Sequence, residues 1–100
     1  MTYLDDLRDK IDKDIDVTTW KDLRPHAARD KVFLVAPSVP LLDAAVAIAS
    51  DDAEKVGAWV ASGELTRPTA AQLGAWESSL DKPFDCVVLS PYVVATERLE

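Results

Sequence analysis

Cysteine, histidine and glycine are scarce in this 100-residue chain, which contains one cysteine, one histidine and three glycines. A single cysteine excludes a disulfide within the chain. Cys86 begins an apolar run over 86–89, where a thiol acts as a small hydrophobic side chain. Gly57, Gly63 and Gly74 are isolated from one another, which excludes a glycine-rich loop for binding phosphate. We therefore predict no cofactor.

Long apolar runs and an excess of positive charge are also missing. No run approaches the roughly 20 apolar residues that a membrane-spanning helix needs, and no N-terminal stretch resembles a secretion signal. The formal net charge is -7, from 18 acidic and 11 basic residues, so the surface repels nucleic acid phosphates and anionic lipid headgroups. We expect a cytoplasmic protein with no nucleic acid partner and no membrane partner.

The size and the apolar content of the chain fit one domain. With 48% hydrophobic residues, the chain can bury a core without disulfides or metals. We expect a single domain over residues 1–100, with an amphipathic N-terminal helix over about 2–14 and an α+β core over about 18–97.

The N-terminal helix has one apolar stripe. Leu4, Leu7 and Ile11 repeat at helical spacing, and charged side chains occupy most of the other positions. A terminal helix of this kind can pack on its own core or on a neighbouring molecule. We expect packing on its own core and keep the stripe as a candidate interaction surface.

A second helix is predicted over 19–29. Thr18 or Thr19 can cap its start, because Thr19 and Asp22 have the spacing of a capping box. Pro25 falls inside this segment, and its ring and missing N–H disfavour a helix interior. The sequence therefore predicts either a kink at Pro25 or two short turns.

The middle of the chain predicts a strand followed by two helices. An apolar strand covers 31–36, and a nearly all-apolar helix over about 40–49 should be largely buried. The next helix begins at Asp51 and Asp52, whose carboxylates favour a helix N-terminus, and it ends at Gly63. Its inward stripe consists of Val56, Trp59 and Val60.

The last third predicts a short edge strand over 65–67, then a helix capped by Thr69, then an extended C-terminal segment. The segment over 84–96 has strand composition, but Pro91 predicts a bend, a bulge or a turn within it. The helical stripe consists of Leu73, Trp76 and Leu80. The whole pattern predicts the α+β class, with a small sheet of two to four strands covered by four or five helices.

Several segments, taken in order, resemble a known family. They are Trp20 with Leu23, VFLVAP, AIASDDAEKVGAWVASGELTRPT, a tryptophan helix and VVLSPYVV. This combination resembles a small bacterial family known only as a domain of unknown function. The chain departs from the family pattern at Pro25 and His26, where aromatic residues are expected, and at Tyr92, where a second tryptophan is expected. The resemblance implies a fold over nearly the whole chain and implies no reaction, ligand or catalytic residue.

His26 is the side chain whose ordinary pKa lies nearest neutrality, and Asp22 lies four positions earlier on the same helix face. An Asp–His pair can orient an imidazole for acid–base chemistry. No serine or cysteine in the sequence context of a nucleophile accompanies it. We therefore interpret His26 as a solvated side chain and predict no catalytic residue.

A candidate cleft is suggested by two serines beside prolines. Ser38 and Ser90 lie at the ends of two apolar strands, and if these strands are neighbours, their loops line one cleft. The alternative is that Ser38 caps a helix and Ser90 lies in a bend. The candidate cleft consists of Ser38, Asp51, Asp52, Ser90 and Tyr92.

The acidic cluster of Asp51, Asp52 and Glu54 offers oxygen ligands of the kind that hold a hard divalent cation. Helix capping explains the same residues more simply, and no calcium-loop motif occurs. We therefore predict no metal site.

Each of the three tryptophans falls on a helical stripe, which favours core packing because an indole buries a large area. An exposed indole would instead mark an interface. The candidate interaction surface consists of Leu4, Leu7, Ile11, Trp20, Trp59 and Trp76.

Because no acid, base and nucleophile stand together in the sequence, we expect a non-enzymatic module for protein or ligand interaction. Its partner is an unknown protein or a second copy of the chain. The alternative is a small hydrolase or a metal-assisted enzyme that uses the loops near Ser38, Asp51 and Ser90.

Overall fold

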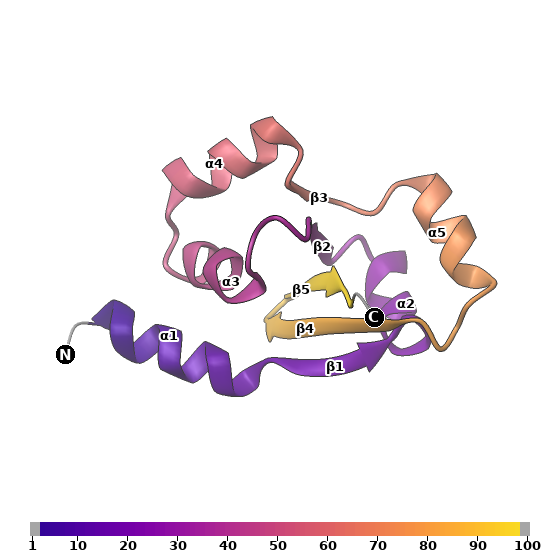
Figure 1. Cartoon of the computed structure of the whole chain (residues 1–100), viewed down its shortest axis with the longest axis horizontal. Helices are drawn as coiled ribbons and strands as arrows, with labels where there is room; N and C mark the ends of the chain where they lie inside the picture. Colours follow the sequence, from indigo (N-terminus) through magenta and orange to yellow (C-terminus); the bar gives the residue numbers. More distant parts are fainter. Residues whose placement is uncertain (1–2, 99–100) are drawn as a thin grey trace.

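Short helices and strands are interspersed along the chain (Figure 1). The structure is a computed structural model that describes residues 3–98, except for the side chain of Leu4. The elements in this range are α1 (Tyr3–Asp14), β1 (Asp16–Thr19), α2 (Trp20–Ala28), β2 (Val32–Val35), α3 (Leu41–Ala49), α4 (Ala53–Ser62), β3 (Leu65–Thr66), α5 (Ala70–Glu77), β4 (Pro83–Leu89) and β5 (Tyr92–Glu97).

All these strands join one mixed sheet in the order β1-β4-β5-β2-β3. The pair β2 and β5 is parallel, with Val32 opposite Val93, and the other pairs are antiparallel. The α+β class is therefore confirmed, as is the helix count within the described residues. The expected two to four strands were wrong, because the described residues contain five.

The extra strands have two origins. The segment Asp16–Thr19 pairs with β4 as an edge strand, whereas the sequence suggested a helix cap there. The predicted C-terminal segment turns back at Ser90-Pro91 and forms the hairpin of β4 and β5. The turn at Pro91 is confirmed. Because the chain reverses there, the segment forms two paired strands, whereas one extended segment was expected.

The start of α2 differs from the predicted capping box. Thr19 occupies the cap position, but its side chain makes no capping hydrogen bond. The N–H groups of Trp20 and Lys21 donate instead to carbonyls of the loop between α5 and β4, at 3.0 and 3.1 Å. Pro25 is exposed within one continuous helix, so the helix does not split into two turns.

Three predicted cap residues are confirmed, namely Asp52, Gly63 and Thr69, but Ser38 does not cap α3, whose N-cap is Pro40. The Asp52 carboxylate accepts a hydrogen bond from the N–H of Lys55 at the start of α4, and Gly63 ends this helix with a left-handed φ of 82°. Thr69 forms a capping box with Gln72 at the start of α5. Each of these caps depends only on residues within about one turn of the helix end, so the sequence alone can reveal it.

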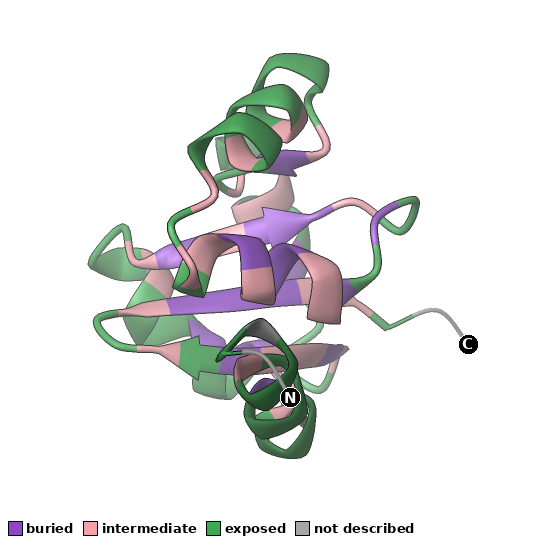
Figure 2. Cartoon of the chain, turned by 90° about the vertical axis from the view of Figure 1, so that its left-hand side faces the viewer, coloured by how far each residue is buried: buried purple, intermediate pink, exposed green. Residues whose placement is uncertain are grey.

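Alternate strand residues face opposite sides of the sheet and pack into two clusters. On one face, α1 and α3 cover Val35, Val87 and Val94. On the other face, Trp20 of α2 and Trp76 of α5 cover Phe84 and its neighbours. Figure 2 shows buried residues concentrated in the sheet and in α3, which lies over it. The core therefore lies in two layers, one on each side of the sheet.

Helix α4 is the least buried part of this arrangement, and none of its residues is fully buried. It forms the mostly exposed helix at the top of Figure 2. Val56 and Trp59 are half-buried, but Val60 is 57% exposed, so Val60 was wrongly placed on the inward stripe. Leu80 was also misplaced, because it lies beyond the end of α5 and is exposed.

Candidate functional site

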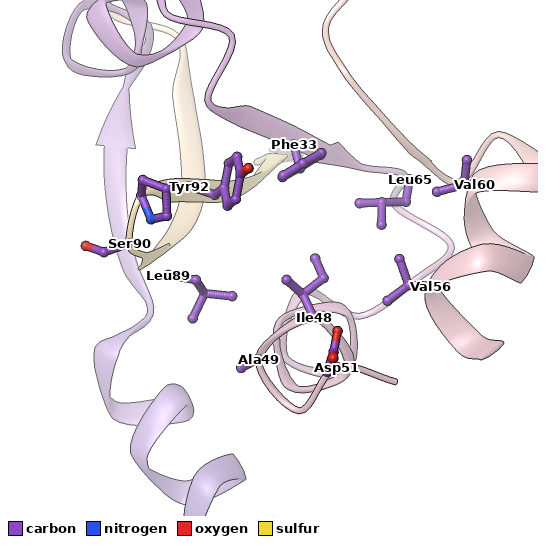
Figure 3. Close-up of a pocket in the computed structure, with 11 residues that line it drawn as sticks. Phe33, Ile48, Ala49, Asp51, Val56, Val60, Leu65, Leu89, Ser90 and Tyr92 are labelled. Carbon is purple, nitrogen blue, oxygen red and sulfur yellow. The ribbon is translucent and has the colours of Figure 1, made fainter. Parts of the chain in front are cut away.

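A groove opens where the C-terminal end of α3, the helix α4 and the turn between β4 and β5 meet (Figure 3). Its volume is about 640 Å³, which falls in the range of small-molecule sites. We call it the α3–α4 groove. Its lining residues are Phe33, Ile48, Ala49, Asp51, Val56, Val60, Leu65, Leu89, Ser90, Pro91 and Tyr92.

The groove exists because α4 stands at the edge of the fold. It packs on α3 and on β3, an edge strand of two residues, rather than across the sheet. The small side chain of Ala49, at the end of α3, is exposed and leaves space beside Ile48. Apolar side chains such as Val56 and Leu89 therefore keep part of their surface accessible.

One end of the groove is aromatic, and two basic side chains outside its lining flank the aromatic rings. The ring centroids of Phe33 on β2 and Tyr92 on β5 lie 5.1 Å apart. The Lys31 ammonium lies 5.2 Å from the Tyr92 centroid, and the Arg67 guanidinium lies 5.6 Å from the Phe33 centroid. Both are cation–π distances. Arg67 also pairs with the carboxylate of Asp30.

The opposite corner of the groove is acidic. Asp51 ends the turn after α3 in a left-handed conformation with a φ of 61°. In Figure 3, Asp51 lies on the far side of Ile48 from Phe33 and Tyr92. Asp52 caps α4 and borders a neighbouring depression rather than the groove. The two ends of the groove therefore carry charges of opposite sign.

The predicted cleft is only partly assembled. Asp51, Ser90 and Tyr92 all line the groove. Because β2 and β5 are parallel, Ser90 before β5 and Ser38 after β2 lie at opposite ends of this strand pair. The sheet register therefore overturns the idea that the two serines share one cleft.

Ser38 instead belongs to a hydrogen-bonded cluster at the other end of β2. Its hydroxyl donates to the Glu64 carboxylate at 2.9 Å, and the Ser62 hydroxyl donates to the same group at 2.8 Å. The hydrogen bonds from Ser62 and Ser38 lower the pKa of Glu64. This cluster ties the loop after β2 to the start of β3.

The residues of the candidate interaction surface separate into two groups. Ile11, Trp20 and Trp76 are buried and belong to the core. Leu7 and Trp59 are half-buried and pack beside the core of the α3 face. The side chain of Leu4 lies outside the described residues. Within the described part of the chain, only Leu7 and Trp59 of this set keep accessible surface.

The histidine and the cysteine of the chain do not line the groove. His26 is exposed on α2, which covers the other face of the sheet. Burial, together with the nearby Asp16 and Asp85 carboxylates, raises the pKa of the Cys86 thiol and keeps it protonated. Over residues 3–98, no three His, Cys, Asp or Glu side chains are grouped to hold a metal ion. The arrangement offers a surface for binding.

Most of the groove was missed from the sequence. Phe33, Ile48 and Leu89 have the composition of core residues, and nothing in their local pattern distinguishes a half-buried wall from a filled interior. Of the lining residues, the candidate cleft contains only Asp51, Ser90 and Tyr92. A sequence signal for the groove was absent, because it depends on how far α4 stands from the sheet.

Over residues 6–97, the chain matches the family described as Protein of unknown function (DUF2288). The chain belongs to this family. The match confirms the family resemblance seen in the sequence, and the family description names no reaction, ligand or partner. No curated protein matches the chain.

A solved structure agrees with the fold of this DUF2288 member. It is the NMR solution structure of PA1075 from Pseudomonas aeruginosa, which is 33% identical in sequence. The similarity covers 95% of this chain and 87% of that chain, with a TM-score of 0.81. Separately, among residues 3–98 no helix has the length and apolar character needed to cross a membrane.

Proposed function

We propose that this protein is a non-enzymatic binding module that takes up an apolar ligand in the α3–α4 groove. The observation that carries this proposal is the accessible apolar lining, in which Phe33, Ile48 and Leu89 are only half-buried around a volume of about 640 Å³. An apolar concavity with a few polar groups at its ends is typical of a small-molecule site. The proposal includes a cytoplasmic location and no nucleic acid partner, and the net charge of -7 supports the second of these.

The enzyme alternative has less support. Asp51 and Ser90 line the groove, but Ser38 lies at the other end of the strand pair. No imidazole accompanies Ser90, since the one histidine of the chain is exposed on α2. A hydrolase needs a base within hydrogen-bonding reach of its nucleophile. Binding therefore explains the groove with fewer assumptions.

The replacement Ala49→Phe is expected to fill the groove and to weaken binding of the neutral apolar dye Nile red. The Ala49 side chain is exposed and lines the groove, so a phenyl ring there takes ligand space without entering the core. Loss of about 50 Å² of apolar contact at roughly 25 cal/mol per Å² weakens binding close to tenfold. The measurement is a fluorescence titration of the dye with each protein.

The matched control is Ala58→Phe, which places the same ring on an exposed position of α4 outside the groove lining. This variant should bind the dye as the wild type does. Equal weakening by both replacements, or no binding by the wild type, would contradict the proposal. Melting temperatures should remain near the wild-type value for both variants, because both positions are exposed.

A further inference from the structure

We infer that the ligand of the α3–α4 groove is an amphipathic anion, namely a free alkyl carboxylate whose head lies beside Lys31 and whose chain runs toward Ile48 and Leu65. This inference rests on the proposed function and adds the chemical class of the ligand. Three features of the described residues carry it: the position of Lys31, its lack of a carboxylate partner, and the apolar path that leads away from it.

The sheet register brings Lys31 to the groove. Because β2 and β5 are parallel with Val32 opposite Val93, the preceding residues Lys31 and Tyr92 lie side by side. Lys31 directly precedes β2 and lies two positions before Phe33, so the two side chains project from the same face. The 5.2 Å separation between the Lys31 ammonium and the Tyr92 ring centroid agrees with this placement. Lys31 is not itself a lining residue, but its ammonium lies against the ring of Tyr92, which lines the groove.

The charge of Lys31 is available to a ligand. Among residues 3–98, no carboxylate forms an ion pair with its ammonium, and its side-chain partner is the Tyr92 ring. The neighbouring Arg67 differs, because the carboxylate of Asp30 already neutralises its guanidinium. A carboxylate entering the groove would complete a charge-assisted hydrogen bond with Lys31. The head group that complements the Lys31 ammonium is therefore an anion.

The apolar part of the site leads away from Lys31. Tyr92 adjoins the ammonium and Phe33 packs against Tyr92, and Figure 3 shows Ile48, Leu65 and Leu89 bordering the space beyond these rings. An alkyl chain in this direction gains about fourfold in affinity for each methylene that it buries. A small head with a long apolar chain therefore fits both parts of the groove.

The acidic groups of the protein favour one orientation of the ligand, and they favour a free molecule over a membrane lipid. Asp51 lies on the far side of Ile48 from the aromatic pair, so an anionic head is repelled from that corner and directed to Lys31. The net charge of -7 acts over a longer range, but physiological salt screens charges beyond about 8 Å. An anionic bilayer meets the whole acidic surface, whereas a single carboxylate meets mainly Lys31. The free molecule is therefore favoured over a membrane.

Isothermal titration with three ten-carbon probes tests the inference, with the two ionic probes used below their micelle concentrations and decanol below its solubility limit. Decanoate is expected to bind about fivefold more tightly than decanol, and more tightly again than decylammonium. In K31Q the preference of decanoate over decanol should disappear, while decanol affinity stays unchanged. The control K21Q removes an exposed lysine of α2, on the opposite face, and should keep the preference.

The outcomes separate this inference from the proposed function. Equal binding of all three probes, or an unchanged preference in K31Q, would overturn the anionic head but leave the apolar groove in place. Tighter binding of decylammonium would also overturn it and would assign the head to Asp51. No binding of any probe would overturn both proposals. A far-ultraviolet circular dichroism spectrum like that of the wild type confirms that K31Q is folded.

Discussion

Replacing Trp20 with alanine is expected to lower the free energy of unfolding by about 3 to 5 kcal/mol. Trp20 is 1% exposed, and its ring centroid lies 5.0 Å from that of Trp76 and 6.4 Å from that of Phe84. Its indole N–H also donates to the Glu77 carboxylate at 3.0 Å, and the truncation removes this bond. Domains are stable by about 5 to 15 kcal/mol, so the loss would be a large fraction of the total.

Urea denaturation followed by circular dichroism measures this loss without relying on the tryptophan signal. The control is Trp59→Ala, which removes an indole that is half-buried at the edge of the α3 face. Its cost should be clearly smaller, because less apolar surface leaves water when Trp59 packs. If both variants lose the same free energy of unfolding, the assignment of Trp20 to the core between the sheet and the helices α2 and α5 is wrong.

The replacement Ala45→Leu is expected to destabilise the fold by about 1 to 3 kcal/mol. Ala45 is 0% exposed, in the part of α3 that packs on the core of the sheet. A larger side chain there pushes α3 away from the sheet or forces neighbouring side chains from their preferred rotamers. The melting temperature and the urea midpoint should therefore both fall.

The same substitution at Ala58 is the control for helix propensity and size. Ala58 is exposed on α4, so Ala58→Leu should change the free energy of unfolding by no more than about 0.5 kcal/mol. An Ala45→Leu variant as stable as the wild type would mean that α3 does not pack closely on the sheet. The described shape of the groove, which α3 helps to form, would then be wrong.

The elements that could be predicted from the sequence are those with local signals. Asp52 and Gly63 bound α4, and Thr69 with Gln72 begins α5, because a cap acts through residues within one helical turn. The strand Asp16–Thr19 could not be predicted in this way. Its four residues become a strand through pairing with β4, which lies far along the chain. Nothing within the segment itself reports that pairing.

The candidate site depends more than the helix ends do on contacts between residues that are far apart in the sequence. The parallel register of β2 and β5 decides that Lys31 lies beside Tyr92 and that Ser38 lies far from Ser90. The sequence places all these residues near strand ends but does not say which ends meet. The half-buried walls of the groove likewise follow from the packing of α4, which has no fully buried residue.

The most direct test of the binding site is a titration of isotope-labelled protein with decanoate, followed by the backbone amide signals in two-dimensional NMR spectra. We expect the largest, saturable shifts at Lys31 and at the groove residues Phe33, Leu65 and Tyr92. Signals of α2 and α5, on the other face of the sheet, should barely move. Shifts confined to that face, or no saturable shifts at all, would contradict the claim that the α3–α4 groove is the binding site.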